Sequence, residues 1–120
     1  MTSDEAISAH LEWKNRFRIG LAGREMLDVA KISADCCCLF GIWLHGEAKT
    51  SLGEDAQYAT CVAHHAVFHL EAGKIAEKVN QREFLAVEGM MSRYSDYAKA
   101  SETLVLSVRE LFRGRDGNSA

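Results

Sequence analysis

Residues 54–80 read EDAQYATCVAHHAVFHLEAGKIAEKVN, and apolar side chains recur along this stretch at intervals of three or four residues. Such a period is typical of a helix that buries one of its faces. The residues on the apolar face are Tyr58, Cys61, Val62, His65, Phe68, His69, Ala72, Ile75, Ala76 and Val79. The stretch therefore predicts a long helix whose buried face contains two histidines.

The segments before this helix predict one long and one short helix. A capping box starts at Thr2, with Glu5 three residues later, and an apolar stripe runs from there to about Ala22. Capping side chains at residues 33–35 precede a short helix over residues 36–45, which Gly46 ends. Residues 26–31 are either a short helical turn or irregular chain, and residues 47–53 are expected to form a polar loop.

A fourth helix is predicted over residues 83–112. The apolar side chains available to pack along it are Leu85, Val87, Met90, Tyr94, Tyr97, Leu104, Val108 and Leu111. The chain contains no proline, and proline both interrupts helices and is common in the turns of sheet proteins. We therefore expect an all-α protein, an antiparallel four-helix bundle with three long helices and one short helix.

The composition is that of one compact domain. The chain has 120 residues, of which 48% are hydrophobic and 26% charged, and its net charge is −3. These values exclude intrinsic disorder and disfavour nucleic acid as a partner. We expect a single domain over residues 1–113 and a disordered tail over residues 114–120.

The chain shows no sign of export or of membrane insertion. Residues 1–5, MTSDE, are polar and acidic, and no apolar segment of a secretory signal follows them. The longest apolar run, CCCLFGIWL at residues 36–44, is far shorter than the ~20 residues of a membrane helix. We therefore expect a cytoplasmic protein without membrane contact, whose cysteines are thiols or metal ligands rather than disulfides.

The two histidines of the long helix have the spacing of a metal site. His65 and His69 are four residues apart, so both imidazoles leave the same face and can bind one zinc ion. The alternative is a pair of buried histidines that are hydrogen-bonded to backbone or water. Ala66 stands where a helical metalloprotease motif has its catalytic glutamate, which disfavours that activity.

Two further residues are expected to face the same core. His10 lies on the apolar stripe of the first helix, and Cys38 opens the run CLFGIWL. A single buried histidine or cysteine is ordinarily a core residue. Three inward imidazoles and a thiol without partners, however, would each lower the stability of the fold by ~1–3 kcal/mol. A single metal ion would accommodate all four side chains.

Three motifs together resemble the chemoreceptor zinc-binding domain family. The family pattern is H-x-x-W-K, then C-x-F/L-G-x-W-L, then H-x-x-F-H. This chain has HLEWK at residues 10–14, CLFGIWL at 38–44 and HAVFH at 65–69. The resemblance covers residues 7–79 and departs at Ile42, where the family often has lysine. It implies that His10, Cys38, His65 and His69 bind Zn²⁺.

The resemblance also implies a function. Such domains occur on bacterial chemoreceptors and diguanylate cyclases, so we expect a free-standing sensory or regulatory module, a homodimer, with a signalling protein of this kind as its effector. Four ligands complete a tetrahedral zinc shell and leave no position for a water nucleophile, so we expect no enzymatic activity. The signal is then zinc itself, or an oxidant that converts Cys38 to a sulfenic acid. The alternatives are a small zinc metalloenzyme with an open coordination position and a purely structural zinc interaction module.

Further residues have predicted supporting roles. The aromatic side chains expected to surround the metal are Trp13, Trp43 and Phe68, and Gly41 is expected to allow close approach beneath Trp43. Asp35 is a candidate hydrogen-bond partner of a ligand, since metal-bound histidines often donate to a carboxylate. His45 and His64 are expected at the surface and Cys61 in the core. Cys36 and Cys37 are either spare thiols, substitutes for Cys38 or sites of oxidation.

Overall fold

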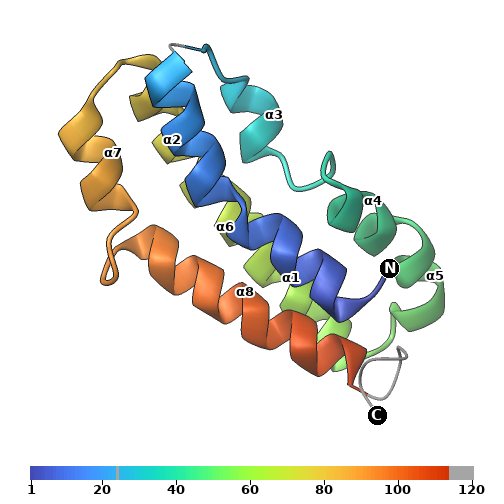
Figure 1. Cartoon of the computed structure of the whole chain (residues 1–120). Coiled ribbons are helices and arrows are strands. Elements are labelled where there is room, and N and C mark those ends of the chain that lie inside the picture. The colour runs from blue at the N-terminus through green and yellow to red at the C-terminus, as the bar shows by residue number, and fades with distance from the viewer. Residues whose placement is uncertain (24, 114–120) are drawn as a thin grey trace.

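The computed structural model describes residues 1–23 and 25–113, and this part of the chain folds into eight helices. They are α1 (Ser3–Leu11), α2 (Trp13–Gly23), α3 (Val29–Ser33), α4 (Leu39–His45), α5 (Glu47–Leu52), α6 (Ala56–Asn80), α7 (Phe84–Met90) and α8 (Asp96–Phe112). The regular structure of the described residues is entirely helical, which confirms the all-α class (Figure 1).

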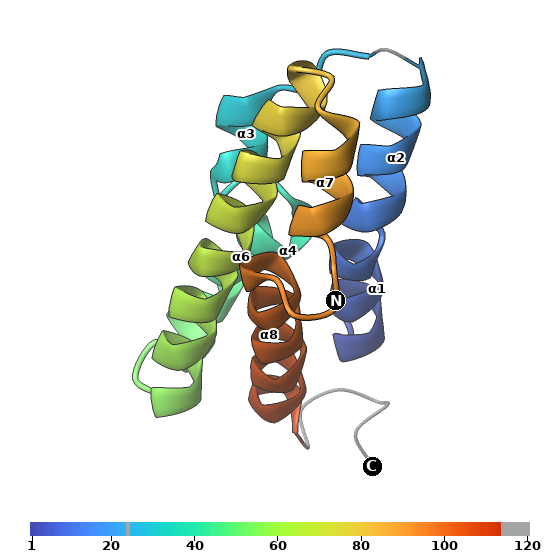
Figure 2. The ribbon, with the colours of Figure 1, turned by 90° about the vertical axis from the view of Figure 1, so that its left-hand side faces the viewer.

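The long helix predicted from residues 54–80 forms the centre of the molecule. This helix, α6, has 25 residues and packs against α2, α3, α7 and α8. Figures 1 and 2 show α1 and α2 on one side of α6 and α8 on another, with α7 and α8 running back along it. Asp55 caps its start by accepting a hydrogen bond from the Gln57 amide at 2.8 Å.

The first predicted helix is interrupted once. Thr2 caps α1 as expected, because its hydroxyl accepts from the Glu5 amide at 3.2 Å. At Glu12 the helix is distorted, and α2 follows directly in nearly the same direction (Figure 1). Backbone hydrogen bonds from Glu12 to Ser8 and from Arg16 to Glu12, both 3.1 Å, continue across the junction, so it is a local distortion and not a turn.

Two predictions for residues 26–53 are wrong in detail. The short helix α4 begins at Leu39 and not at Cys36, because Cys38 is its N-cap. Residues 47–53, expected to be a polar loop, contain the helix α5, which Ala48 anchors by full burial. Residues 26–31, predicted to be either a helical turn or irregular chain, include the start of α3, which Asp28 caps by accepting from the Lys31 amide at 3.0 Å.

The prediction of one helix over residues 83–112 is also wrong, because the chain breaks between α7 and α8. Ser95 starts α8 by accepting from the Ala98 amide at 3.1 Å, so a serine cap replaces a continuous turn. Leu85 and Tyr94, expected to pack, are 90% and 79% exposed. The break therefore turns part of the predicted apolar stripe toward solvent.

The core joins α6 to the helices around it and includes imidazole rings. His65 and His69 are among the largest fully buried side chains, together with Phe17, Phe40, Phe68 and Ile75. Within the described part of the chain, none of the helices is both long and apolar enough to cross a membrane. The tail predicted at residues 114–120 lies outside the described residues.

Candidate metal centre

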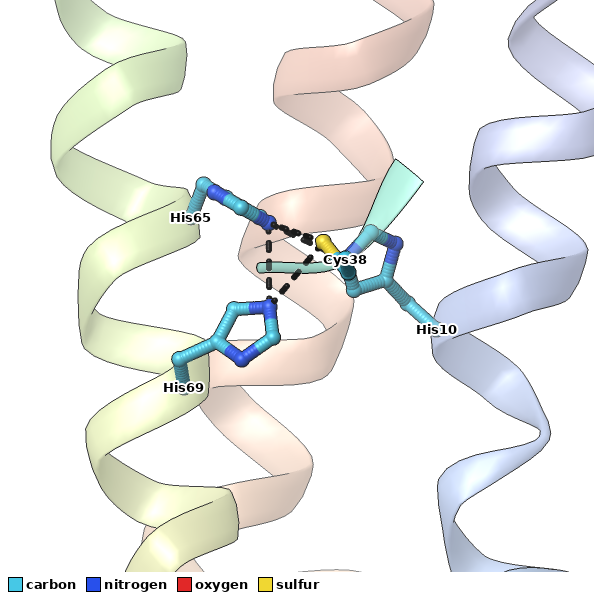
Figure 3. A group of neighbouring side chains, drawn as sticks. All are labelled: His10, Cys38, His65 and His69. Atoms are coloured by element: carbon cyan, nitrogen blue, oxygen red, sulfur yellow. Dashed lines mark hydrogen bonds between the residues drawn. The ribbon is translucent and has the colours of Figure 1, made fainter. Parts of the chain in front are cut away.

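Four side chains from three separate elements meet in the core. His10 comes from α1, Cys38 from the N-cap of α4, and His65 and His69 from consecutive turns of α6 (Figure 3). One nitrogen of each histidine and the Cys38 sulfur all lie within 4.8 Å of one another. All four residues that the sequence singled out are therefore together, and we call them the His–Cys cluster.

The separations within the cluster are short. Nε2 of His65 lies 3.2 Å from Nε2 of His10 and 3.0 Å from Nε2 of His69. The Cys38 Sγ atom lies 3.4 Å from His65 Nε2 and 3.5 Å from His69 Nε2. Its distance from His10 Nε2 is 3.9 Å.

These separations match the edges of a tetrahedral zinc site. With Zn–N bonds of about 2.0–2.1 Å and a Zn–S bond of about 2.3 Å, a tetrahedron has N···N edges of about 3.3 Å and S···N edges of about 3.6 Å. The N···N separations in the cluster are 3.0 and 3.2 Å, and the S···N separations run from 3.4 to 3.9 Å. These five edges are each within about 0.4 Å of that expectation, and the sixth, between His10 and His69, is no longer than 4.8 Å. The donor set therefore fits one Zn²⁺ ion.

Backbone carbonyls orient two of the three imidazoles. Nδ1 of His10 donates to the Ala6 carbonyl at 2.7 Å, and Nδ1 of His69 donates to the Ile32 carbonyl at 2.9 Å. Because a carbonyl oxygen only accepts, each Nδ1 has the proton when the ring is neutral. The Nε2 lone pairs of both rings therefore point into the cluster, which is the arrangement that a metal cation requires.

His65 differs from the other two rings. Among the described residues, its Nδ1 is a buried side-chain atom without a hydrogen-bond partner. Its Nε2 is close to every other member of the cluster. With Nε2 bound to a cation, the neutral ring has its proton on Nδ1, so the cluster and the surrounding packing hold His65 in place, and not a hydrogen bond at Nδ1.

Burial keeps the histidines in the form that binds metals. It lowers the pKa of His10 to about 4 and the pKa of His65 to about 2, with the neighbouring imidazoles adding to both effects. Burial also lowers the pKa of His69, although its hydrogen bond to Ile32 opposes this. All three rings are therefore neutral at neutral pH, and a neutral imidazole is the ligand form.

The Cys38 thiol has a mixed environment. Burial raises its pKa, whereas backbone amides, first that of Gly41, act in the opposite direction. The Gly41 amide donates to Sγ at 3.2 Å, which makes Cys38 the cap of α4 and fixes the position of its sulfur. A bound metal cation favours the thiolate outright, so this thiol becomes a strong ligand in its presence.

Gly41 allows the turn before α4 to close. A Cβ atom at this position would overlap the carbonyl oxygen of Asp35 and would lie 3.2 Å from Cε1 of His65. The sequence predicted a close approach at Gly41, and the approaching groups are the turn at Asp35 and the ring of His65. A glycine here lets Cys38 reach the cluster.

Phenylalanine rings surround the cluster. Phe68 is edge-on to His10 with ring centroids 5.1 Å apart, and Phe40 is edge-on to His65 at 5.0 Å. Phe68 was predicted and Phe40 was missed, although it belongs to the CLFGIWL motif. Trp43 lies one layer further out, where it stacks on Phe112 at 5.0 Å.

The remaining predictions near the cluster have mixed outcomes. Asp35 does not bond to a cluster histidine as expected, because its carboxylate lies 3.0 Å from Nε2 of His45. The backbone carbonyls of Ala6 and Ile32 take the role expected of it. Cys61 is buried in the core and His45 is exposed, as predicted, whereas His64 is half-buried and bonds to Ser107.

A cleft of about 510 Å³ connects the cluster to the surface, and we call it the α2–α3 cleft. Its buried end consists of His10, Cys38 and His69, and its lining toward the surface includes Trp13, Leu27, Asp28, Lys31, Cys37 and Leu39. Trp13 thus lines the approach to the cluster. Three of the four cluster side chains therefore face a route from the solvent.

An all-helical fold with a buried tetrahedral set of three imidazoles and one thiol defines a metal-binding domain of the zinc class. The family model of the chemoreceptor zinc-binding domain matches residues 10–76, which is more than half of the chain and includes the whole cluster. The chain belongs to this family. No curated protein and no solved structure shows a significant match to it.

Proposed function

We propose that the protein binds one Zn²⁺ ion through His10, Cys38, His65 and His69 and serves as a sensory or regulatory domain in bacterial signal transduction. The observation that carries the zinc assignment is the convergence of three Nε2 atoms and one Sγ at tetrahedral separations. The signalling role follows the family to which the chain belongs.

The donor set supports binding and regulation more than catalysis. A Zn²⁺ ion supplies a positive charge that favours the thiolate of Cys38 and holds the three imidazoles neutral. Four protein ligands fill a tetrahedral shell, whereas catalytic zinc sites keep one position for water. The domain is therefore proposed to act without enzymatic activity of its own.

Metal occupancy would be transmitted through the helices that contribute the ligands. His10 belongs to α1, which packs against α8, and Cys38 caps α4, which continues into α5. Loss of the metal leaves three inward lone pairs and a thiol without a common partner, which weakens the attachment of α1 and α4 to α6. Such a change of packing is the proposed output.

Oxidation of Cys38 is a second proposed signal that would produce the same change of helix packing. Hydrogen peroxide would oxidise the Cys38 thiolate to a sulfenic acid: the O–O bond breaks, one oxygen is transferred to sulfur, and the other leaves as hydroxide, which a solvent proton converts to water. The oxidised sulfur is a poorer zinc ligand, so α4 would detach from the cluster. We propose a homodimer in a reducing compartment such as the cytoplasm, with a chemoreceptor or a diguanylate cyclase as the effector.

Metal analysis of the chain purified without added zinc tests this proposal. We expect about one equivalent of zinc in the native chain, as four-ligand structural sites bind it tightly. Cys38→Ser removes the thiolate but retains an oxygen that can cap α4, so zinc affinity should fall while the helix persists. Cys61→Ala is the matched control, since this buried thiol is not a member of the His–Cys cluster.

Less than half an equivalent of bound zinc in the native chain, unchanged by Cys38→Ser, would contradict the zinc assignment. A metalloenzyme with an open position is the second candidate, and the α2–α3 cleft, which reaches three cluster residues, is the observation that favours it. The absorption spectrum of the cobalt-substituted protein separates the two. A closed site shows four-coordinate cobalt with one thiolate that added anions leave unchanged, and an open site responds to them.

A further inference from the structure

Two thiols stand at the surface beside the cluster without belonging to it. Cys36 and Cys37 are both exposed, and their Sγ atoms are 3.4 Å apart. They occupy the turn that leads into Cys38 and α4. The zinc site proposed above uses neither of them.

The geometry of this pair favours a shared metal ion over a disulfide. A disulfide needs Cα atoms about 4.4–6.8 Å apart and sulfurs at about 2.05 Å, whereas the Cα atoms of adjacent residues are about 3.8 Å apart. Two thiolates on one tetrahedral zinc ion are about 3.8 Å apart. The observed 3.4 Å is therefore closer to the separation of two metal ligands than to that of bonded sulfurs.

The position of the pair connects it to the cluster. Cys37 lines the α2–α3 cleft, which ends on His10, Cys38 and His69. Asp28, Arg16 and Lys31 also line this cleft, so its charged side chains are one carboxylate and two cations. A metal ion held by the pair would therefore lie at the surface end of the route to the four buried ligands.

We propose that Cys36 and Cys37 form a second, solvent-facing site for a thiophilic divalent cation such as Zn²⁺ or Cd²⁺, and that they pass this cation through the α2–α3 cleft to the His–Cys cluster. The inference rests on the proposed zinc function. Each thiol of the pair releases one proton on binding and recovers it on transfer, when its bond to the cation breaks. Cys38 then loses its proton as its sulfur and three Nε2 atoms bind the cation, and no electron is exchanged.

The experiment compares three forms of the metal-free full chain: the native protein, the double variant Cys36→Ser/Cys37→Ser and the control Cys61→Ala. Both substitutions of the double variant lie at exposed positions, so the fold should persist. Cd²⁺ is titrated into each form, with native mass spectrometry to count bound ions and thiolate-to-cadmium absorption to count sulfur ligands. The rate of Zn²⁺ uptake from a chromophoric chelator is measured by stopped flow.

We expect the native chain and Cys61→Ala to bind two Cd²⁺ ions and the double variant to bind one. Zinc uptake by the His–Cys cluster of the double variant should be slower by about tenfold, with the same final occupancy of the cluster. A second Cd²⁺ ion in the double variant, or an unchanged uptake rate, overturns the inference. Lost occupancy of the first site in the double variant also overturns it, because the pair would then belong to the cluster.

Failure of the proposed function has a different signature. In that case Cys38→Ser leaves the tightly bound ion in place, or the native chain binds no such ion. The comparison of Cys38→Ser with the double variant therefore assigns a negative result to one site or to the other.

Discussion

Replacing Gly41 with alanine tests whether the turn before α4 must close tightly for Cys38 to join the cluster. The added methyl group would overlap the Asp35 carbonyl oxygen and come within 3.2 Å of Cε1 of His65. The carbonyl belongs to the backbone and has no flexible end to move aside. The turn over residues 35–38 must therefore shift, and the Cys38 sulfur moves with it.

Two consequences have magnitudes that can be estimated. Overpacking of a well-packed site costs about 1–3 kcal/mol, so the free energy of unfolding should fall by that amount. Displacement of Cys38 also lengthens its bond from the Gly41 amide, now 3.2 Å, and its approach to the histidines. A loss of about 1.4 kcal/mol in zinc binding corresponds to about tenfold weaker affinity.

Urea unfolding of the zinc-loaded and the metal-free protein, together with a competition titration against a zinc chelator, measures both effects. Gly89→Ala is the matched control, because a Cβ there meets no atom within 4 Å and the residue lies in α7, outside the cluster. This control should be neutral or more stable by about 0.4–1 kcal/mol. If Gly41→Ala matches Gly89→Ala in stability and zinc affinity, the steric argument for Gly41 is refuted.

Three further predictions concern the core, acid and the surface. Phe68→Ala should lower the free energy of unfolding by about 3–5 kcal/mol, because the ring is fully buried against His10 and His69. Chemical denaturation measures this free energy, and a loss below about 1 kcal/mol would contradict the packing. In the metal-free protein, stability should be full above pH 6.5 and fall toward pH 4, because the unfolded chain protonates His10 at its ordinary pKa of 6.5 and the folded chain only at about 4. A denaturation midpoint that rises on acidification over this range would contradict the neutral, buried state of this ring. Asp35→Asn should change zinc affinity by less than about twofold and the free energy of unfolding by less than about 1 kcal/mol, since Asp35 pairs with His45 near the surface. A loss of zinc affinity of about tenfold in chelator competition would show that Asp35 is a partner of the metal site.

The local spacing of residues was sufficient to predict much of the fold. The α6 helix follows from the apolar period of residues 54–80, and the α1 cap from Thr2 and Glu5. Where the pattern was less regular, the prediction erred. The apolar spacing predicted one helix over residues 83–112, but α7 ends at Met90 and Ser95 caps the start of α8. A side-chain cap competes with helix continuation, and packing decides between them.

The site was predicted as a set of residues but not as an arrangement. The motifs identified His10, Cys38, His65 and His69, and the structure brings all four together. The partners that orient the imidazoles are backbone carbonyls of Ala6 and Ile32, which no side-chain pattern encodes. For that reason the sequence suggested Asp35 for this role, and the structure corrected it.

By itself the sequence determined that His65 and His69 share one face of a helix, because 3.6 residues per turn set that relation whatever surrounds the helix. It also determined, through spaced motifs, which residues meet them. Only the tertiary structure decided how closely α1 and the turn before α4 approach α6, and so whether the nitrogens and the sulfur lie at zinc-ligand separations. The physical reason is that distances between helices depend on the packing of side chains such as Phe40 and Phe68 and on the space that Gly41 leaves free. These contacts form between segments that are far apart in the chain.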